Sequence, residues 1–397
     1  MEVVYSDDCL LHSPPKELTR GEWKTYTESP SRLVSIKQFI DKNTEFKVVS
    51  PDDYTLAPIL AVHKREYVDF LSTIYKDWVD AGLPKDTVVS EIFGHCSMVG
   101  HLEPEEWKKK ALETPSGRIG LYSFDLSVSF DKDTWLSTYT SAQIVLSAAH
   151  RLLQQSQTAK TSSIYALCRP PGHHAAHDVA GGYCFINNVA VAAKFLQDYE
   201  VREMEAFARL SKVKKEQTLP KPAVLNKNNK RRILIVDVDY HHGNGTQAIF
   251  YDDPSVFYIS LHGSPDYPYF TGSGTETGSG DGAGYNLNIP LDPITTTDAI
   301  YLDHLEKALN KPEVVEFKAD IVICSLGLDT WHEDPVGGIK GLVDPLTYTK
   351  IGKLLKTSAS CVNIPVLFVQ EGGYTIERLG ELAGKVLLGY LSTENTT

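Results

Sequence analysis

Aspartate and histidine side chains follow two apolar stretches of the sequence. Asp239 and His241 come just after the run Ile233–Val236, and because they are two residues apart an extended chain points both to the same side. Asp329 ends a second stretch, Ser325-Leu-Gly-Leu-Asp329. Two carboxylates and one imidazole suit a divalent transition metal, zinc above all, and leave a coordination position open, as in catalytic sites. The alternative is a charged strand end followed by an ordinary turn.

A pair of adjacent histidines follows another apolar run. His173 and His174 come directly after a Pro-Pro-Gly bend behind residues 164–168. Imidazoles are the usual general acid–base groups near neutral pH, although an isolated pair would more simply be a surface feature. Asp237 would point to the same side of the strand as Asp239 but lies two residues earlier, deeper in the sheet. From there it could orient a catalytic imidazole. Its alternative role is a buried carboxylate satisfied by backbone donors or by a structural cation.

Aromatic residues on glycine-rich stretches are the remaining candidates. In Glu371-Gly-Gly-Tyr374 the glycines allow a sharp turn that brings Tyr374 over the site, where its phenol could donate a hydrogen bond to a developing oxyanion. The tyrosine could also simply pack in the loop. Residues 181–185 and 267–270 place further aromatic side chains on loops, where they could wall a narrow tunnel or cap the core.

Alternating strand and helix patterns predict the elements that position these residues. Apolar runs predict buried strands at 2–5, 164–168, 233–236, 256–261, 321–326 and 366–369. Helical spacing predicts helices at 31–41, 63–76, 134–154, 187–197, 297–309, 348–358 and 377–391. This alternation favours a mostly parallel sheet with helices on both faces, whose strands present a site at their carboxyl ends. Residues 12–30 and 82–120 are expected to be loops, and the second is long enough to be functional.

Composition limits the classes of protein. With 397 residues, of which 42% are hydrophobic, residues 1–397 are expected to form a single catalytic domain. A net charge of −12 argues against nucleic acid as a partner and favours a cationic substrate. The N-terminus has no signal-peptide pattern and no apolar run reaches the length of a membrane span, so we expect no membrane partner and a cytoplasmic location, with nuclear entry left open.

Two further features of the composition concern the cysteines and one basic segment. The six cysteines include no Cys-x-x-Cys pair and are expected to be buried thiols in a reducing compartment. Residues 199–232 carry ten Lys or Arg and four Glu, which predicts a basic surface insertion with a helix near 201–214. This insertion either binds an acidic partner or merely lengthens a helix–strand connection.

The motifs together resemble one known family. In chain order they are Arg-Pro-Pro-Gly-His-His174, Gly-Gly-Tyr-Cys-Phe-Ile-Asn-Asn188, Asp-Val-Asp-Tyr-His-His-Gly-Asn-Gly-Thr-Gln247, Ser-Leu-Gly-Leu-Asp329 and Glu-Gly-Gly-Tyr374. The set resembles the histone deacetylase superfamily of zinc amidohydrolases from about Tyr5 to Leu391. The opening Val-Val-Tyr-Ser-Asp-Asp8 and the long segment before Gly117-Arg-Ile-Gly-Leu-Tyr-Ser-Phe-Asp125 are most similar to its acetylpolyamine amidohydrolases.

The resemblance implies the arginase-deacetylase α/β fold, with an eight-stranded parallel sheet, and a role for each matching residue. The implied zinc ligands are Asp239, His241 and Asp329. The implied catalytic groups are His174 as general base and then acid, His173 oriented by Asp237, Asn244 as the partner of His174, and Tyr374 as the donor to the acetyl carbonyl. The implied tunnel walls are Tyr183 and Phe270. A structural potassium ion is implied at Asp237, Asp239, His241, Ser260 and Leu261, and a homodimer is implied as the assembly.

The expected reaction is removal of acetyl groups from acetylated polyamines or related amines. Four glutamates in the loops that shape the mouth could bind distal ammonium groups or be ordinary solvated charges: Glu17, Glu103, Glu105 and Glu106. Relatives that select one polyamine carry a glutamate in an Asp-Pro-Glu run, but here Val336 follows Asp334-Pro335, which leaves that selectivity open.

Three other functions compete with this expectation. A protein-lysine deacetylase would use the same chemistry on another substrate. A non-catalytic acetyl-amine binding protein would be expected to have lost one of the site residues, all of which this chain keeps. A two-metal ureohydrolase of the arginase type shares the fold, but Trp331 stands where its second aspartate would be.

Overall fold

The structure is a computed structural model that describes residues 1–19, 21–158, 161–198 and 230–392. The helix expected near 201–214 lies outside the described residues. So does the predicted basic insertion 199–232, apart from its last three residues.

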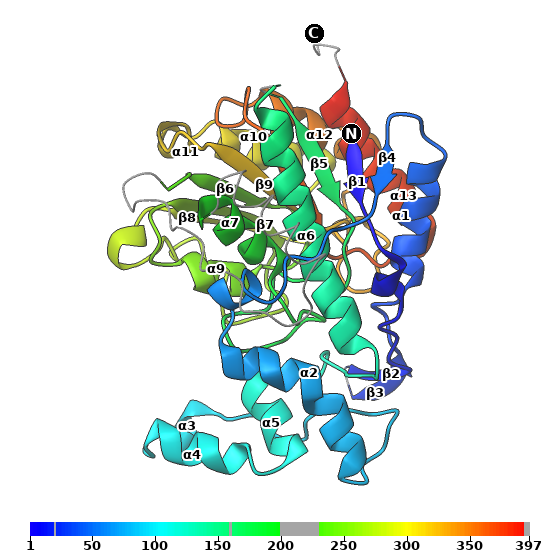
Figure 1. Ribbon diagram of the computed structural model, residues 1–397. Helices are drawn as coiled ribbons and strands as arrows, with labels where there is room; N and C mark the ends of the chain where they lie inside the picture. Colours follow the sequence, from blue (N-terminus) through cyan, green and yellow to red (C-terminus); the bar gives the residue numbers. More distant parts are fainter. Residues whose placement is uncertain (20, 159–160, 199–229, 393–397) are drawn as a thin grey trace.

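A single large sheet organises the chain (Figure 1). Its eight strands are all parallel and follow the order β4-β1-β5-β10-β9-β6-β7-β8. In that order they are Lys47–Val49, Glu2–Val4, Ser163–Ala166, Val366–Gln370, Ile321–Leu326, Ile233–Asp237, Val256–Gly263 and Asn286–Leu291. The predicted parallel, eight-stranded sheet is therefore confirmed.

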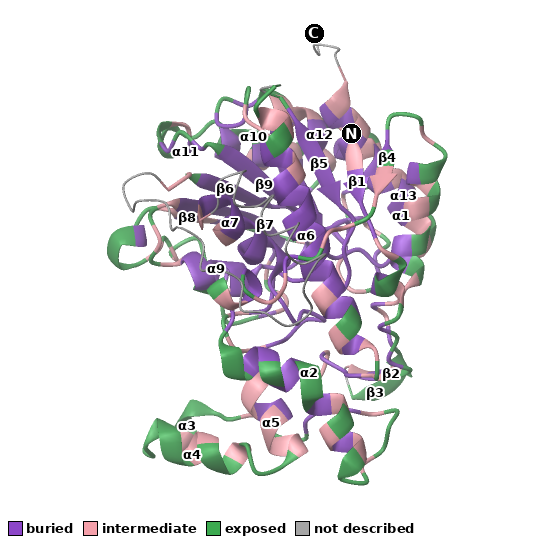
Figure 2. Cartoon of the chain, viewed as in Figure 1, coloured by how far each residue is buried: buried purple, intermediate pink, exposed green. Residues whose placement is uncertain are grey.

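Burial differs between the inner and the edge strands (Figure 2). Every residue of β5, β10, β9, β6 and β7 is buried, because these strands are covered on both faces and carry apolar side chains on both. The edge strands β4 and β8 keep exposed or half-buried positions. Neither edge strand was predicted, since a short or half-polar strand gives no continuous apolar run.

Helices pack on both faces of the sheet (Figure 1). One layer comprises α6 (Thr134–Ser156), α7 (Asn188–Asp198) and α9 (Asn244–Phe250). The other comprises α1 (Ser31–Asp41), α10 (Asp298–Leu309), α12 (Leu346–Thr357) and α13 (Ile376–Leu391), with the short α11 (Pro312–Glu316) beside α10. Single 3-10 turns form at Asp7–Leu10, Ile59–Ala61 and Gly280–Gly282. The predicted cover on both faces is thus confirmed, and the core lies between these layers and the sheet.

The two segments expected to be loops contain regular structure at the lower end of Figure 1. An antiparallel hairpin forms from β2 (Lys16–Thr19) and β3 (Glu22–Thr25). The second segment contains α3 (Cys96–Val99), α4 (Pro104–Ala111) and most of α5 (Pro115–Tyr122), and α5 packs on the predicted helix α2 (Arg65–Asp80). The loop prediction for 82–120 was wrong because α3 to α5 are short, and α3 and α4 are mostly exposed, so the segment shows little hydrophobic periodicity.

Within the described part of the chain, no helix is both long and apolar enough to cross a membrane.

Candidate active site

The predicted chemistry-bearing residues gather at the carboxyl ends of neighbouring strands. His173 and His174 follow β5, Tyr374 follows β10, Asp329 follows β9, and Asp237 is the last residue of β6. These four strands are consecutive in the sheet. Because all run in the same direction, their ends open onto one edge, and residues far apart in sequence meet there.

Asp239, His241 and Asp329 form a compact buried cluster. One ligand atom from each lies within 4.8 Å of the other two. Nδ1 of His241 is 3.0 Å from Oδ2 of Asp329 and 3.3 Å from Oδ1 of Asp239. Backbone amides hold the carboxylates, since Gly372 donates to Asp239 at 2.8 Å and Tyr240 donates to Asp329 at 2.8 Å. The structure therefore brings the three predicted zinc ligands together.

The donor set fits a divalent cation. Burial, followed by the nearby charge of Asp239, raises the pKa of Asp329 to about 7, because two carboxylates are crowded in a buried site. A cation among the three donors would offset that repulsion, and two oxygens with one imidazole nitrogen suit zinc. A Cβ atom added at Gly327 or Gly372 would lie 2.1 or 2.5 Å from Oδ2 of Asp239, so only glycine allows this close approach of the backbone.

The two adjacent imidazole rings have different hydrogen-bond partners, one charged and one uncharged. Nδ1 of His173 is 3.1 Å from Oδ2 of Asp237, whereas Nδ1 of His174 is 2.7 Å from the amide Oδ1 of Asn244. Burial opposes the charge on His173, but the carboxylates around it outweigh that effect and raise its pKa to about 10. Burial, and then the positive charges of His173 and His241, lower the pKa of His174 well below its usual value. The surroundings therefore shift the pKa values of the two rings in opposite directions.

Tyr374 forms one wall of the site. It packs with Tyr183, Tyr26 and Val336, and its ring lies 4.7 Å from the guanidinium of Arg32. Burial raises the pKa of Tyr374 well above its usual value. Its phenol therefore remains a protonated hydrogen-bond donor at any physiological pH.

A cavity of about 270 Å³ opens onto this cluster. His174, His241, Tyr183 and Tyr374 line it, together with Tyr267. The centroid of the Tyr267 ring lies 4.9 Å from that of His174, at an interplanar angle of 89°. A small, largely aromatic cavity above a metal-type cluster can hold one short chain with an amide at its inner end.

Phe270, the predicted second tunnel wall, lies outside this cavity. Its side chain is 95% exposed. The preceding turn directs Tyr267 and Tyr269 toward the cavity, with Tyr269 at a φ of +64°, and the chain then leaves the cavity before Phe270. The prediction was wrong because the direction of a side chain in an irregular turn cannot be read from its distance along the sequence.

The four predicted mouth glutamates do not line the cavity. Glu17 is 2% exposed, because the β2–β3 hairpin turns its carboxylate inward, where it accepts a hydrogen bond from Thr27 Oγ1 at 2.6 Å. It lies behind the wall residue Tyr183. The other three are exposed at the start of α4, because this helix packs on α5 and leaves its acidic first turn in solvent: Glu103, Glu105 and Glu106. Glu105 lines a different hollow, between α2 and α4.

The predicted potassium residues lie side by side. Asp237 pairs in register with Ser260 between β6 and β7, and both are buried, as is Leu261. The Ser260 hydroxyl is 2.9 Å from Nδ1 of His262. Potassium binding here stays a prediction.

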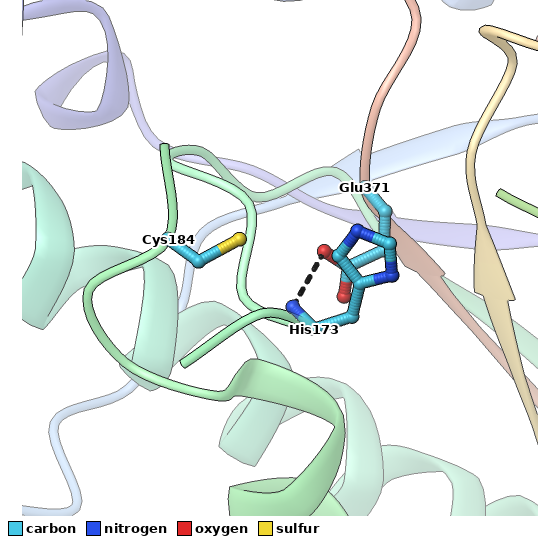
Figure 3. A group of neighbouring side chains, drawn as sticks. All are labelled: His173, Cys184 and Glu371. Carbon is cyan, nitrogen blue, oxygen red and sulfur yellow. Dashed lines mark hydrogen bonds between the residues drawn. The ribbon is translucent and has the colours of Figure 1, made fainter. Parts of the chain in front are cut away.

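A second buried group of metal-type side chains includes one of the two histidines (Figure 3). It contains His173, Cys184 and Glu371. Oε2 of Glu371 accepts hydrogen bonds from the backbone amides of Gly172 at 2.7 Å and His173 at 3.2 Å. The Cys184 thiol donates to the Gly182 carbonyl at 3.3 Å. The two contacts of Glu371 fix the turn that carries the histidines.

Sequence reasoning missed two aspartates that hold the walls of the cavity. Asp125 accepts hydrogen bonds from the backbone amide of Gly182 at 2.9 Å and from the Tyr267 hydroxyl at 2.6 Å. Asp334 accepts from the backbone amides of Tyr374 at 2.7 Å and Val336 at 3.0 Å. No local pattern marks either residue, because their partners are distant in the sequence or belong to the backbone.

Comparison with known proteins places this site in a family. The model of the histone deacetylase domain matches residues 26–205 and 222–390. Acetylpolyamine amidohydrolase 2 of Pseudomonas aeruginosa is 34% identical over 397 residues, covering 98% of each chain. Acetylpolyamine amidohydrolase of Burkholderia pseudomallei is 32% identical over 384 residues, covering 96% of this chain and 95% of that protein.

Solved structures agree with this assignment. The crystal structure of acetylpolyamine aminohydrolase from Burkholderia pseudomallei has a TM-score of 0.79 at 32% identity, covering 98% of each chain. The HD domain of HDA15, at 24% identity and a TM-score of 0.68, shares the fold. The matching family model, the near-complete coverage and the shared parallel sheet lead to one conclusion: this chain belongs to the histone deacetylase family and has the arginase-deacetylase fold.

Proposed function

We propose that this protein is a zinc-dependent amidohydrolase that removes acetyl groups from acetylated polyamines or related small acetylated amines. One observation carries the proposal: the buried cluster of Asp239, His241 and Asp329 lies at the floor of the same cavity that His174 and Tyr374 line. The names of the similar full-length relatives, acetylpolyamine amidohydrolases, support the choice of substrate class.

The cluster would hold one zinc ion through Asp239, His241 and Asp329. Zinc in such a site supplies Lewis acidity, which activates water near neutral pH and polarises a carbonyl oxygen. The remaining groups in the cavity supply what amide hydrolysis also needs, namely proton transfer and stabilisation of an oxyanion.

His174 transfers the proton in this proposal. Because the carbonyl oxygen of Asn244 can only accept, the Nδ1 atom of His174 carries the proton and Nε2 keeps its lone pair. Nε2 removes a proton from water as the water oxygen attacks the acetyl carbon, and it returns that proton to the amine nitrogen as the C–N bond breaks. The products are acetate and the free amine.

His173 and Tyr374 stabilise negative charge as it develops. His173 is charged and lies beside the reacting groups, held by Asp237. The Tyr374 phenol donates a hydrogen bond to the carbonyl oxygen as that oxygen becomes negative. Such a donor contributes on the order of 3 kcal/mol to the stability of the transition state.

Substrate choice is tested by comparing amides directly. We expect the protein, with zinc restored, to show a much larger kcat/KM for N-acetylputrescine, N-acetylcadaverine or N8-acetylspermidine than for an acetyllysine histone peptide. A preference for the peptide would make the protein a lysine deacetylase instead. Turnover of none of these amides would reject the proposed activity.

Removal of one ligand tests the metal site. We expect Asp329→Ala to reduce turnover by more than about 10³-fold and to abolish stoichiometric zinc, because two donors hold zinc far more weakly than three. The matched control is Asp303→Ala, which removes an exposed carboxylate on α10 that is paired with Lys307. Unchanged turnover and unchanged zinc content in Asp329→Ala, measured by metal analysis, would refute the ligand assignment.

Two further expectations concern the assembly and a second cation. We expect a homodimer, measurable by sedimentation. We also expect a structural potassium ion held by Asp237, Asp239, His241, Ser260 and Leu261, measurable as a gain in thermal stability when potassium replaces a bulky organic cation.

A further inference from the structure

One carboxylate reaches the wall of the active-site cavity without belonging to the metal cluster or to the acid–base machinery. Asp266 lines this cavity and is half-buried. Among the described residues that line the cavity, it is the sole carboxylate, and none of them is lysine or arginine. The glutamates expected to bind an ammonium group lie behind the wall or in the exposed first turn of α4. The charge that an approaching amine would meet is therefore that of Asp266.

The Asp266 carboxylate is fixed in place but keeps free acceptor capacity. Oδ2 accepts a hydrogen bond from the Tyr240 hydroxyl at 2.7 Å, and Oδ1 accepts one from the backbone amide of Tyr267 at 2.7 Å. A carboxylate has about four acceptor positions, so each oxygen can still receive one donor. An anchored carboxylate binds a cation with little loss of side-chain entropy, because its orientation is already set.

Aromatic rings surround the same position. Tyr267 and Tyr269 both line the cavity, and their ring centroids are 6.4 Å apart at an interplanar angle of 80°. The faces of tyrosine rings attract ammonium groups. Tyr269 is 69% exposed, which places this aromatic group at the outer end of the cavity. His174 and His241, at the inner end, would meet the amide.

We propose that Asp266 is the residue that binds the distal ammonium group of an acetylated diamine. The acetamide would lie at the metal cluster, the methylene chain would pass between Tyr183 and Tyr267, and the ammonium group would donate to the free positions of the Asp266 carboxylate. This assignment rests on the proposed deacetylase function and adds the residue that distinguishes a cationic amine from a neutral one.

A pair of amides that differ in one group tests the assignment. N-acetylputrescine ends in an ammonium group, and N-pentylacetamide has the same chain with a methyl group in its place. In the zinc-loaded wild type we expect kcat/KM to be larger for N-acetylputrescine. Asp266→Asn keeps the size of the side chain and an acceptor for Tyr267, but removes the charge. We expect it to reduce kcat/KM for N-acetylputrescine by about 10- to 100-fold, the range of a charge-assisted hydrogen bond, with a much smaller change for N-pentylacetamide.

Binding of free putrescine gives a readout that does not depend on turnover. We expect calorimetry to show that Asp266→Asn weakens putrescine binding about tenfold or more. The matched charge control is Asp281→Asn, an exposed aspartate in the 3-10 turn Gly280–Gly282, which we expect to change neither readout.

The results of these experiments distinguish a failure of the Asp266 assignment from a failure of the proposed deacetylase function. Equal losses for both amides in Asp266→Asn would mean a structural role and would overturn the assignment, as would an unchanged ratio between the amides. A wild type that hydrolyses neither amide but binds putrescine through Asp266 would reject the proposed reaction and retain the ammonium site. A wild type that neither hydrolyses the amides nor binds putrescine would reject both.

Discussion

At the scale of single residues, the proposed chemistry depends on two neighbouring histidines whose surroundings shift their pKa values in opposite directions. Both rings are buried, so burial alone would make both neutral. The difference comes from the charges around each ring. The carboxylates of Asp239 and Asp237 raise the pKa of His173, whereas the positive charges of His173 and His241 lower that of His174, whose Nδ1 partner is the uncharged amide of Asn244.

Replacing the amide by a carboxylate should therefore shift the pH profile. In Asn244→Asp a negative charge next to His174 should raise the pKa of His174. The neutral base would then exist only at higher pH, so the acidic limb of the kcat/KM profile should move to higher pH, with activity falling as pH decreases through the new value. The measurement is kcat/KM for N-acetylputrescine between pH 5 and pH 9.

A control separates this local effect from a change in total charge. Asn310→Asp adds the same charge at the exposed C-terminus of α10 and should leave the profile in place. An acidic limb at the same pH in Asn244→Asp and in the wild type would contradict the role of His174 as the base.

At the scale of elements, one buried aspartate connects the turn after β10 to the loop after β9. Oδ2 of Asp334 accepts from the backbone amides of Tyr374 at 2.7 Å and Thr375 at 3.1 Å. Oδ1 accepts from those of Val336 at 3.0 Å and Gly337 at 3.2 Å. Four backbone donors on one carboxylate hold Tyr374, the proposed oxyanion donor, against the cavity wall that Val336 forms.

Asp334→Asn should misplace Tyr374, because an amide has one acceptor oxygen and would direct its NH₂ group at two N–H donors. We expect kcat to fall about 10- to 100-fold with a smaller change in KM, since the lost interaction acts mainly in the transition state. Kinetics of Asp334→Asn, Tyr374→Phe and the double variant form a cycle in which Asp334→Asn should have little further effect once the phenol is absent. A full additional loss in the Tyr374→Phe background would show that Asp334 does not act through Tyr374.

At the scale of the whole molecule, buried neutral histidines couple stability to pH. His63 is 2% exposed, and its Nε2 atom accepts a hydrogen bond from the backbone amide of Asn187 at 2.9 Å, between α2 and the start of α7. Burial lowers the pKa of His63 to about 4. Between this value and about 6.5, the ordinary pKa, the unfolded chain binds a proton that the folded chain does not.

The free energy of unfolding should therefore fall as pH decreases from about 6.5 toward 4. His63 alone should account for about 2 kcal/mol between pH 7.5 and pH 5. His63→Gln keeps an acceptor for Asn187 but cannot be protonated, so urea unfolding of this variant should lose about that much less stability over the same range. Identical pH dependences in the variant and the wild type would contradict the assignment.

The sequence alone determined the parallel sheet, the strands that end at the site and the residues of the Asp239, His241 and Asp329 cluster. Each of these depends on local information, since an apolar run defines an inner strand and a residue just past its end lies at the edge where ligands bind. Asp239 and His241 are two residues apart, and Asp329 ends the neighbouring strand, so the topology had to bring them together.

Only the tertiary structure decided which side chains enclose the cavity. Tyr267, not Phe270, faces His174, because its hydroxyl is bound by Asp125, 142 residues away in the sequence. Glu17 lies behind the wall instead of at the mouth, because the β2–β3 hairpin turns its carboxylate inward. In loops, the direction of a side chain is set by its partners and not by a repeating backbone geometry. Those partners come from distant parts of the chain, so local patterns carry no information about them.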